Sequence, residues 1–111
     1  MIEITVLNYL KEQIDVPVYM ERPEDDTGEY VVIEKTSSSR SDHICQAAFA
    51  FQSFGNTLLR AAEINEDVKA IMDDIIELPE ITRSQLNSDY NFTDTAKKRY
   101  RYQAVYDITH Y

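Results

Sequence analysis

The fold is decided by residues Cys45 to Glu77, which read CQAAFAFQSFGNTLLRAAEINEDVKAIMDDIIE. The first ten residues have the pattern of a strand, because side chains alternate between the two faces of a strand. This alternation places Phe49 and Phe51 on one face, and their large aromatic rings mark it as the buried face. The same face carries Cys45 and Ala47. We therefore expect this strand to carry one half of the hydrophobic core.

A long amphipathic helix follows the strand. Gly55 and Asn56 interrupt the strand, and Asn56 is expected to cap the helix, because its side chain can accept a hydrogen bond from a free helical N–H group. Pro79 is expected to end the helix. Apolar residues repeat at spacings of three and four, which predicts a helix that packs against the aromatic face of the strand. This stripe consists of Ala61, Ile64, Val68, Ile71, Ile75 and Leu78, and it is widened by Leu58, Ala62, Met72 and Ile76.

The residues before this stretch form three further predicted elements. Met1–Ile14 has apolar residues at helical spacing, and Val18–Glu21 is expected to be a short edge strand because Pro17 cannot donate to a β-ladder. Tyr30–Lys35 is rich in residues that favour strands. The polar residues Thr36–Asp42 are expected to form a connector with a mobile tip.

The residues after the long helix are expected to form a β-hairpin. Its strands are Ile81–Phe92 and Lys98–His110, joined by a turn at Asp94–Lys97. The second strand has the clearest two-residue periodicity in the chain. The predicted order of elements is α-β-β-β-α-β-β, in one domain over residues 1–111. This order indicates an α+β fold in which two helices pack on one face of an antiparallel sheet.

The charge distribution suggests a partner of opposite charge. The chain of 111 residues has a formal net charge of −9. Its acidic character disfavours nonspecific binding to nucleic acid, which depends on neutralising phosphates. The basic residues gather late in the chain, at Lys97, Lys98, Arg99 and Arg101. This basic cluster favours an acidic partner, which could be another copy of the chain. No apolar run reaches the roughly 20 residues that span a bilayer, so no membrane partner is expected.

No catalytic or metal-binding grouping is visible in the sequence. His43 and His110 lack neighbouring ligands at the spacing of a metal site. Cys45 is assigned to the core rather than to catalysis. The acidic segment 22–28 is expected to be a solvated turn; a divalent cation site there would lack the regular ligand spacing of a calcium loop. We therefore expect no enzymatic activity, no metal and no cofactor.

A stacking platform for single-stranded nucleic acid is a further possibility that the sequence offers. Tyr100 and Tyr102 alternate with Arg99 and Arg101, and such a mixture of aromatic and basic residues can bind unpaired bases. The acidic body of the chain makes this the minor interpretation. No sequence-specific binding to nucleic acid is expected.

Two stretches resemble the small tail-completion proteins of tailed bacteriophages and prophages. FQSFGNTLLRAAEIN, Phe51–Asn65, is similar to their strand-to-helix junction, and NSDYNFTDTAKKRYRYQAVYDI, Asn87–Ile108, is similar to their closing hairpin. With the order of elements and the length, the resemblance covers nearly the whole chain. It points to the tail terminator, or head–tail joining, family of phages with long non-contractile tails. Because these motifs consist of strand and turn residues, they are not a chemical fingerprint.

The resemblance implies a structural virion protein. Such proteins form a ring, typically of six subunits, on the end of the tail tube, where the ring stops tube polymerisation and offers a surface to the head-side connector. The implied partners are other copies of the chain, the tail tube protein and the connector or neck protein, with DNA able to pass through the ring. The implied location is the tail or neck of the virion, after assembly in the host cytoplasm. Other interpretations are a different neck, minor tail or head-completion protein, a small bacterial regulatory binding module and a small enzyme.

The expected subunit or partner interface combines basic and acidic residues. A head-to-tail ring needs two unlike patches that complement each other, and opposite charges suit that requirement. Charge reversal at Arg99 and Arg101 is expected to leave the monomer folded, because both point away from the tyrosines of the last strand. The interface residues that we assign are Arg40, Lys97, Lys98, Arg99, Arg101, Glu66 and Asp73.

Overall fold

A five-stranded sheet centred on β3 (Ile44–Gly55) forms the body of the protein in a computed structural model that describes residues 1–111. β3 pairs antiparallel with β2 (Tyr30–Ser41) and with β5 (Tyr100–His110). At the edges, β4 (Ile81–Asn91) pairs antiparallel with β5, and the two-residue β1 (Val18–Tyr19) pairs with β2. The order across the sheet is β1-β2-β3-β5-β4. The predicted α+β class and order of elements are confirmed, but β1 runs parallel to β2, so the sheet is not entirely antiparallel.

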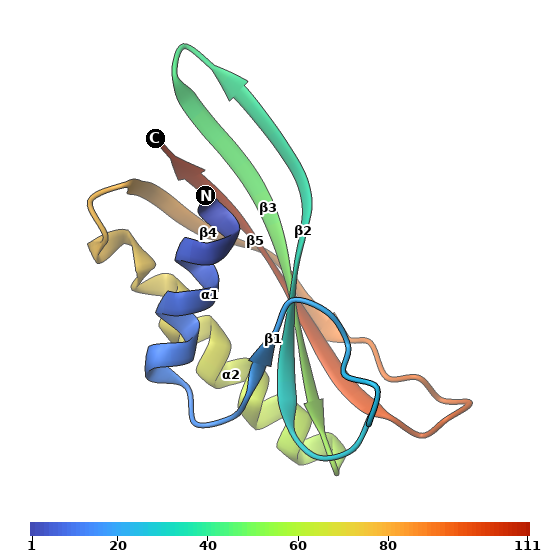
Figure 1. Ribbon diagram of the computed structural model, residues 1–111. Helices are drawn as coiled ribbons and strands as arrows, with labels where there is room; N and C mark the ends of the chain where they lie inside the picture. Colours follow the sequence, from blue (N-terminus) through green and yellow to red (C-terminus); the bar gives the residue numbers. More distant parts are fainter.

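Both helices, α1 (Ile2–Gln13) and α2 (Leu58–Asp73), lie on the same side of the sheet (Figure 1). The cap of α2 differs from the prediction. Thr57 is the N-cap residue, not Asn56, and its side-chain oxygen accepts a hydrogen bond of 3.1 Å from the backbone N–H of Arg60. Threonine and asparagine have the same capping chemistry, so the sequence alone could not choose between the two neighbours.

The apolar stripe after Gly55 does not belong to one continuous helix. α2 ends at Asp73, and residues 75–77 form the short 3₁₀ helix η1 (Ile75–Glu77) before Pro79. The 3₁₀ turn keeps Ile75 fully buried while the chain changes direction toward β4. Such a turn is common at the end of an α-helix because it satisfies carbonyl groups that have no helical partner.

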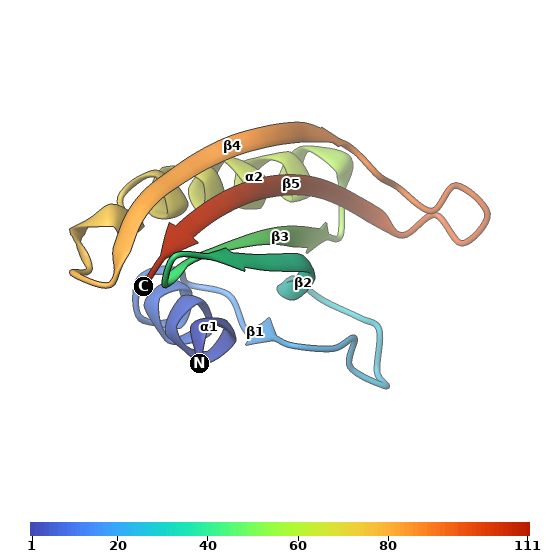
Figure 2. The same ribbon diagram turned by 90° about the horizontal axis from the view of Figure 1, so that it is seen from above.

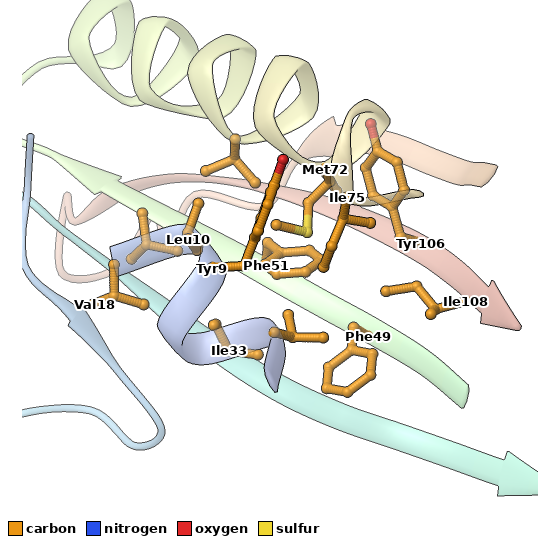
Figure 3. Packing of buried hydrophobic residues seen from close by; sticks show 14 of the residues in the cluster. Tyr9, Leu10, Val18, Ile33, Phe49, Phe51, Met72, Ile75, Tyr106 and Ile108 are labelled. Carbon is orange, nitrogen blue, oxygen red and sulfur yellow. The ribbon is translucent and has the colours of Figure 1, made fainter. Parts of the chain in front are cut away.

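The predicted contact between the aromatic face of β3 and the stripe of α2 is confirmed. Phe49 and Phe51 are fully buried, with ring centroids 6.2 Å apart, in the same cluster as Ile75 of η1 and the apolar residues of α2 (Figure 3). The stripe is narrower than predicted, since Leu58 and Ile76 are 41% and 55% exposed. Full burial of an aromatic side chain stabilises the fold by about 1.5–3 kcal/mol.

Two tyrosine hydroxyls connect the end of α2 and the following helix η1 to α1 and β5. The hydroxyl of Tyr9, in α1, donates to the carbonyl oxygen of Asp74 at 3.1 Å and to the carboxylate of Glu77 at 3.0 Å. The hydroxyl of Tyr106, in β5, donates to the carboxylate of Asp73 at 2.7 Å. Burial and the neighbouring charge of Asp73 raise the pKa of Tyr106 well above its ordinary value. Tyr106 therefore remains a neutral donor, and its ring contributes to the core.

The segment Thr36–Asp42 is not the polar connector that the sequence predicted. β2 continues to Ser41, paired with β3 as far as its first residue, Ile44. The turn consists of only Asp42 and His43, whose φ angles of 51° and 68° are typical of a two-residue hairpin turn. The serines of this segment are exposed, so the backbone ladder rather than side-chain burial holds the strand in place.

The two hairpins extend the molecule in opposite directions. The β2–β3 hairpin projects beyond one end of the helices, and the β4–β5 hairpin projects beyond the other end (Figures 1 and 2). The molecule measures 45 × 25 × 23 Å. Bulges interrupt two of the strands: one lies between Lys35 and Ser37 in β2, and two lie in β4, at residues 81–83 and 86–88.

Candidate functional site: the arginine–aromatic cluster

A second, smaller core lies on the face of the sheet opposite the helices. Alternation along β2 and β3 turns Tyr30, Val32 and Phe54 to this face, and all three are buried. The rings of Tyr30 and Phe54 stack with their centroids 4.6 Å apart. No helix covers this face, so other groups must exclude water from these rings.

Three arginine side chains surround Phe54. The guanidinium carbons of Arg22, Arg99 and Arg101 lie 4.9, 5.4 and 5.7 Å from the centre of the Phe54 ring. These distances are within the range of cation–π contacts. We call the set Arg22, Asp26, Tyr30, Phe54, Arg99 and Arg101 the arginine–aromatic cluster. Its residues come from the loop before β2, from the start of β2, from the end of β3, and from the β4–β5 turn and the start of β5.

Arg99 is the structural centre of this cluster. Its guanidinium donates to the carboxylate of Asp26 at 3.1 Å and to the carbonyl oxygens of Gly28 at 2.5 Å and Gly55 at 3.2 Å. Only 11% of its side chain is exposed. The expectation that charge reversal at Arg99 leaves the monomer folded is therefore wrong, because a glutamate there would face the carboxylate of Asp26 and two carbonyl oxygens. Arg99 is therefore not available as an exposed interface residue, because the loop over residues 22–28 covers this end of the sheet.

Asp26 is the one carboxylate of the cluster. It accepts hydrogen bonds from Arg22, Arg99 and the hydroxyl of Tyr30. Burial alone would raise the pKa of Asp26, but these three donors outweigh it and lower the pKa below its ordinary value. The acidic segment 22–28 is thus only partly the solvated turn that we expected, because Asp26 turns inward. Nowhere in the chain do three potential metal-ligating side chains form a group.

Arg101 differs from the other two arginines because it forms no ion pair. Its Nε–H donates to the carbonyl oxygen of Phe92 at 2.7 Å, and its guanidinium carbon lies 4.2 Å from the centre of the Phe92 ring. Burial, followed by repulsion from Arg22, lowers the pKa of Arg101. The remaining N–H groups of its guanidinium have no acceptor within the chain.

The other predicted interface residues lie in three separate places. Lys97 and Lys98 are exposed in the turn of the β4–β5 hairpin, whereas Arg40 is exposed on the opposite hairpin. Glu66 and Asp73 lie on α2, where Glu66 pairs with a lysine of the same helix at 2.8 Å and Asp73 accepts from Tyr106. The structure therefore brings Arg99 and Arg101 together and separates the rest.

Sequence reasoning missed Arg22 as a member of this site. Arg22 follows the short edge strand β1 and opens the acidic loop, far from Arg101 in the sequence. Its one local signal is the spacing of four residues to Asp26, with which it forms an ion pair. The sequence predicted a basic cluster from residues that are adjacent in the chain, and Arg22 joins it only through the fold.

The cysteine and the histidines form no catalytic group. Cys45 is half-buried at the start of β3, rather than fully in the core, and the strand register places it opposite His110. This neighbourhood was not predicted, because the two residues are distant in the sequence. His43 lies in the turn of the β2–β3 hairpin. None of these side chains belongs to a group of three potential metal ligands.

The largest hollow lies on the uncovered face of the sheet and is polar. It has a volume of about 450 Å³ and is lined by residues of β2, β3, β4 and β5. Its polar lining consists of Ser37, Ser38, Ser39, Gln46, Arg83, Gln85, Asp107 and Thr109. It is an open depression of the surface rather than an enclosed cavity.

Comparisons of the sequence with models of known protein families and with curated proteins find no match. Neither helix of the protein is long and apolar enough to cross a membrane. The site must therefore be interpreted from its own geometry. The site consists of two buried, stacked aromatic rings, two partly exposed arginines and one largely buried arginine that joins three segments of the chain.

Proposed function

We propose that this chain is a structural virion protein that forms a ring at the end of a phage tail tube, stops tube polymerisation and provides the surface to which the head is joined. The observation that carries this proposal is the projection of two hairpins from opposite ends of a helix-covered sheet. A subunit with a separate projection at each end can contact one neighbour with the first and another neighbour with the second.

Such a subunit suits a head-to-tail ring. A head-to-tail interface joins two different patches, and a ring results when the rotation between subunits closes. The turn of the β4–β5 hairpin is basic, with Lys97 and Lys98 exposed, whereas the exposed side of α2 is acidic, with Glu66 and Asp67 exposed. These unlike surfaces are on different parts of the molecule, which favours a head-to-tail contact over a self-complementary one.

The resemblance of Phe51–Asn65 and Asn87–Ile108 to tail-completion proteins supports the same role. The second stretch spans most of the β4–β5 hairpin, which is one of the two projections, whereas the first spans the end of β3 and the start of α2, away from the tip of the β2–β3 hairpin. The tail tube protein, the head-side connector and further copies of the chain are the partners that this role requires. The role needs no catalytic group.

The test is the assembly of the purified full-length chain. We expect electron microscopy, with and without isolated tail tubes, to show rings with a central hole, either free or on tube ends, and mass photometry to give a closed oligomer. A chain that stays monomeric at all concentrations and does not bind tube ends would overturn the proposal. A chain that binds the head-side connector but not the tube would reassign it to the neck.

A matched pair of variants locates the contact. Replacing Lys97 and Lys98 with glutamate should slow ring formation at low salt, because rim charges mainly set the rate of encounter. Replacing Lys11 with glutamate reverses an exposed lysine on α1, away from both hairpins, and is the control. If both variants assemble at the same rate as the parent chain, the hairpin turn is not part of the interface.

A further inference from the structure

The arginine–aromatic cluster contains more positive than negative charge. Three guanidinium groups surround one aromatic ring, and Asp26 is the only carboxylate that forms an ion pair with any of them. The carboxylate of Asp94 acts on Arg101 without forming an ion pair. Asp26 is shared by Arg22 and Arg99, so Arg101 is left without an ion pair. An unpaired charge that is partly removed from water is unfavourable, and a second anion beside Arg101 would relieve this cost.

The hydrogen-bonding capacity of the cluster is also incomplete. An arginine has five N–H donors in a planar fork that matches a carboxylate or a phosphate. Arg101 uses one donor, on the carbonyl oxygen of Phe92, and Arg22 binds only Asp26. The unused donors belong to two guanidinium groups that face the same ring of Phe54.

An external anion can reach these donors. The side chain of Arg22 is 37% exposed, and Arg101 is half-buried. The rings of Phe54 and Phe92 hold the guanidinium of Arg101 in place by stacking, which reduces the entropy lost when a ligand binds. The cluster thus combines preorganised donors, excess positive charge and access from solvent.

We infer that Arg22 and Arg101 form a carboxylate-binding site that takes an acidic side chain of a partner protein chain. Asp26 is an example of carboxylate binding within the same cluster, because its carboxylate accepts hydrogen bonds from Arg22, Arg99 and Tyr30. A protein carboxylate is favoured over the phosphates of a nucleic acid, because exposed Glu24 and Asp25 flank the site and would repel a polyanion. The inference goes beyond the proposed function, because it concerns the chemistry of recognition and holds whether or not the chain forms a ring.

The test is a titration of the full-length chain followed by NMR signals of the arginine Nε–H groups. The probes are a capped tripeptide with two glutamates, the matching tripeptide with two glutamines, inorganic phosphate and a short thymidine oligonucleotide, all at constant ionic strength. We expect the glutamate peptide to shift the Arg101 signal in a saturable way and the glutamine peptide to leave it unchanged. Succinate, as a free dicarboxylate, should bind at the same site, and tighter binding of the glutamate peptide would favour a protein source.

Substitutions test whether Arg101, rather than any exposed arginine, binds the glutamate peptide. Arg101→Gln should weaken binding of the glutamate peptide by about tenfold or more, the factor that corresponds to one charge-assisted contact of roughly 1.4 kcal/mol. Arg83→Gln removes an exposed arginine on β4, outside the predicted interface, and should change the affinity by less than about twofold. If Arg101→Gln does not fold, Arg22→Gln serves as the second variant, because Arg22 is more exposed and makes fewer contacts.

Three results would overturn the inference. The first is the absence of any saturable shift with the glutamate peptide or with succinate. The second is equal weakening by Arg101→Gln and Arg83→Gln, which would indicate general charge screening. The third is tighter binding of phosphate and of the oligonucleotide than of the glutamate peptide, which would assign the site to nucleic acid.

Discussion

Replacing Arg99 with glutamine is expected to lower the free energy of unfolding by about 3 kcal/mol. The substitution removes one charge-assisted hydrogen bond to Asp26, two hydrogen bonds to the carbonyl oxygens of Gly28 and Gly55, and the contact with the rings of Tyr30 and Phe54. A hydrogen bond that involves a charged group contributes about 1.5–3 kcal/mol. Breaking a buried ion pair costs about 3–5 kcal/mol. We take the lower end because Asp26 keeps Arg22 and Tyr30 as donors.

Urea denaturation followed by circular dichroism measures this change. With a denaturant slope of about 1–3 kcal/mol per molar for a small domain, the midpoint should fall by about 1–3 M. The matched control is Arg40→Gln, since Arg40 is an exposed arginine without an ion pair, and its midpoint should stay close to that of the parent chain. If Arg99→Gln and Arg40→Gln unfold at the same urea concentration, Arg99 does not join the three segments as described.

Three further predictions follow from the core, from the junction between β3 and α2, and from the loop before β2. Phe49→Ala should cost roughly 3–5 kcal/mol, because the side chain is fully buried, and a loss below about 1 kcal/mol by urea denaturation would argue against the core described above. Gly55→Ala should cost about 1–3 kcal/mol, because the added Cβ would lie 2.4 Å from the backbone nitrogen of Ala61; a neutral result in thermal unfolding would mean that this close approach does not exist in solution. Asp26→Asn should destabilise the chain near neutral pH and have no effect in acid, because a lowered carboxyl pKa stabilises the fold above the unfolded-state value, near 3.8, and this contribution is lost as the pH falls through the folded-state value. Glu24→Gln, in the same loop but exposed, is the control for the pH series, and parallel pH profiles of the two variants would contradict the assignment.

The order of elements and the main core could be predicted because they depend on local periodicity. Phe49 and Phe51 alternate in a strand, and the apolar residues after Gly55 repeat at helical spacing, so both patterns specify a face as well as an element. The buried residue Asn65 interrupts the helical stripe and was not predicted. Its side-chain N–H group donates to Asp89 at 2.7 Å, a partner on β4 that no local pattern reveals.

The candidate site could be predicted only in part, because its contacts join distant segments. The two-residue period assigned Arg99 and Arg101 to the face opposite the tyrosines of the last strand, but it could not show that the loop over residues 22–28 covers that face. The ion pair between Arg99 and Asp26 spans 73 residues. The strand from Thr36 to Ser41 was missed for a related reason, since its polar side chains carry no periodic signal and its backbone ladder with β3 joins residues that no local pattern connects.

The bulges in β2 and β4 have a consequence for aggregation. A straight strand with unpaired N–H and C=O groups is a template on which other chains can stack, and natural proteins disrupt such edges with bulges and charged residues. β4 has two bulges, and the part of β2 that extends beyond β1 has one, next to Lys35. The regular spacing needed for cross-β stacking is therefore broken at both free edges. The uncovered edges of this sheet are therefore poor templates for strand addition by another chain.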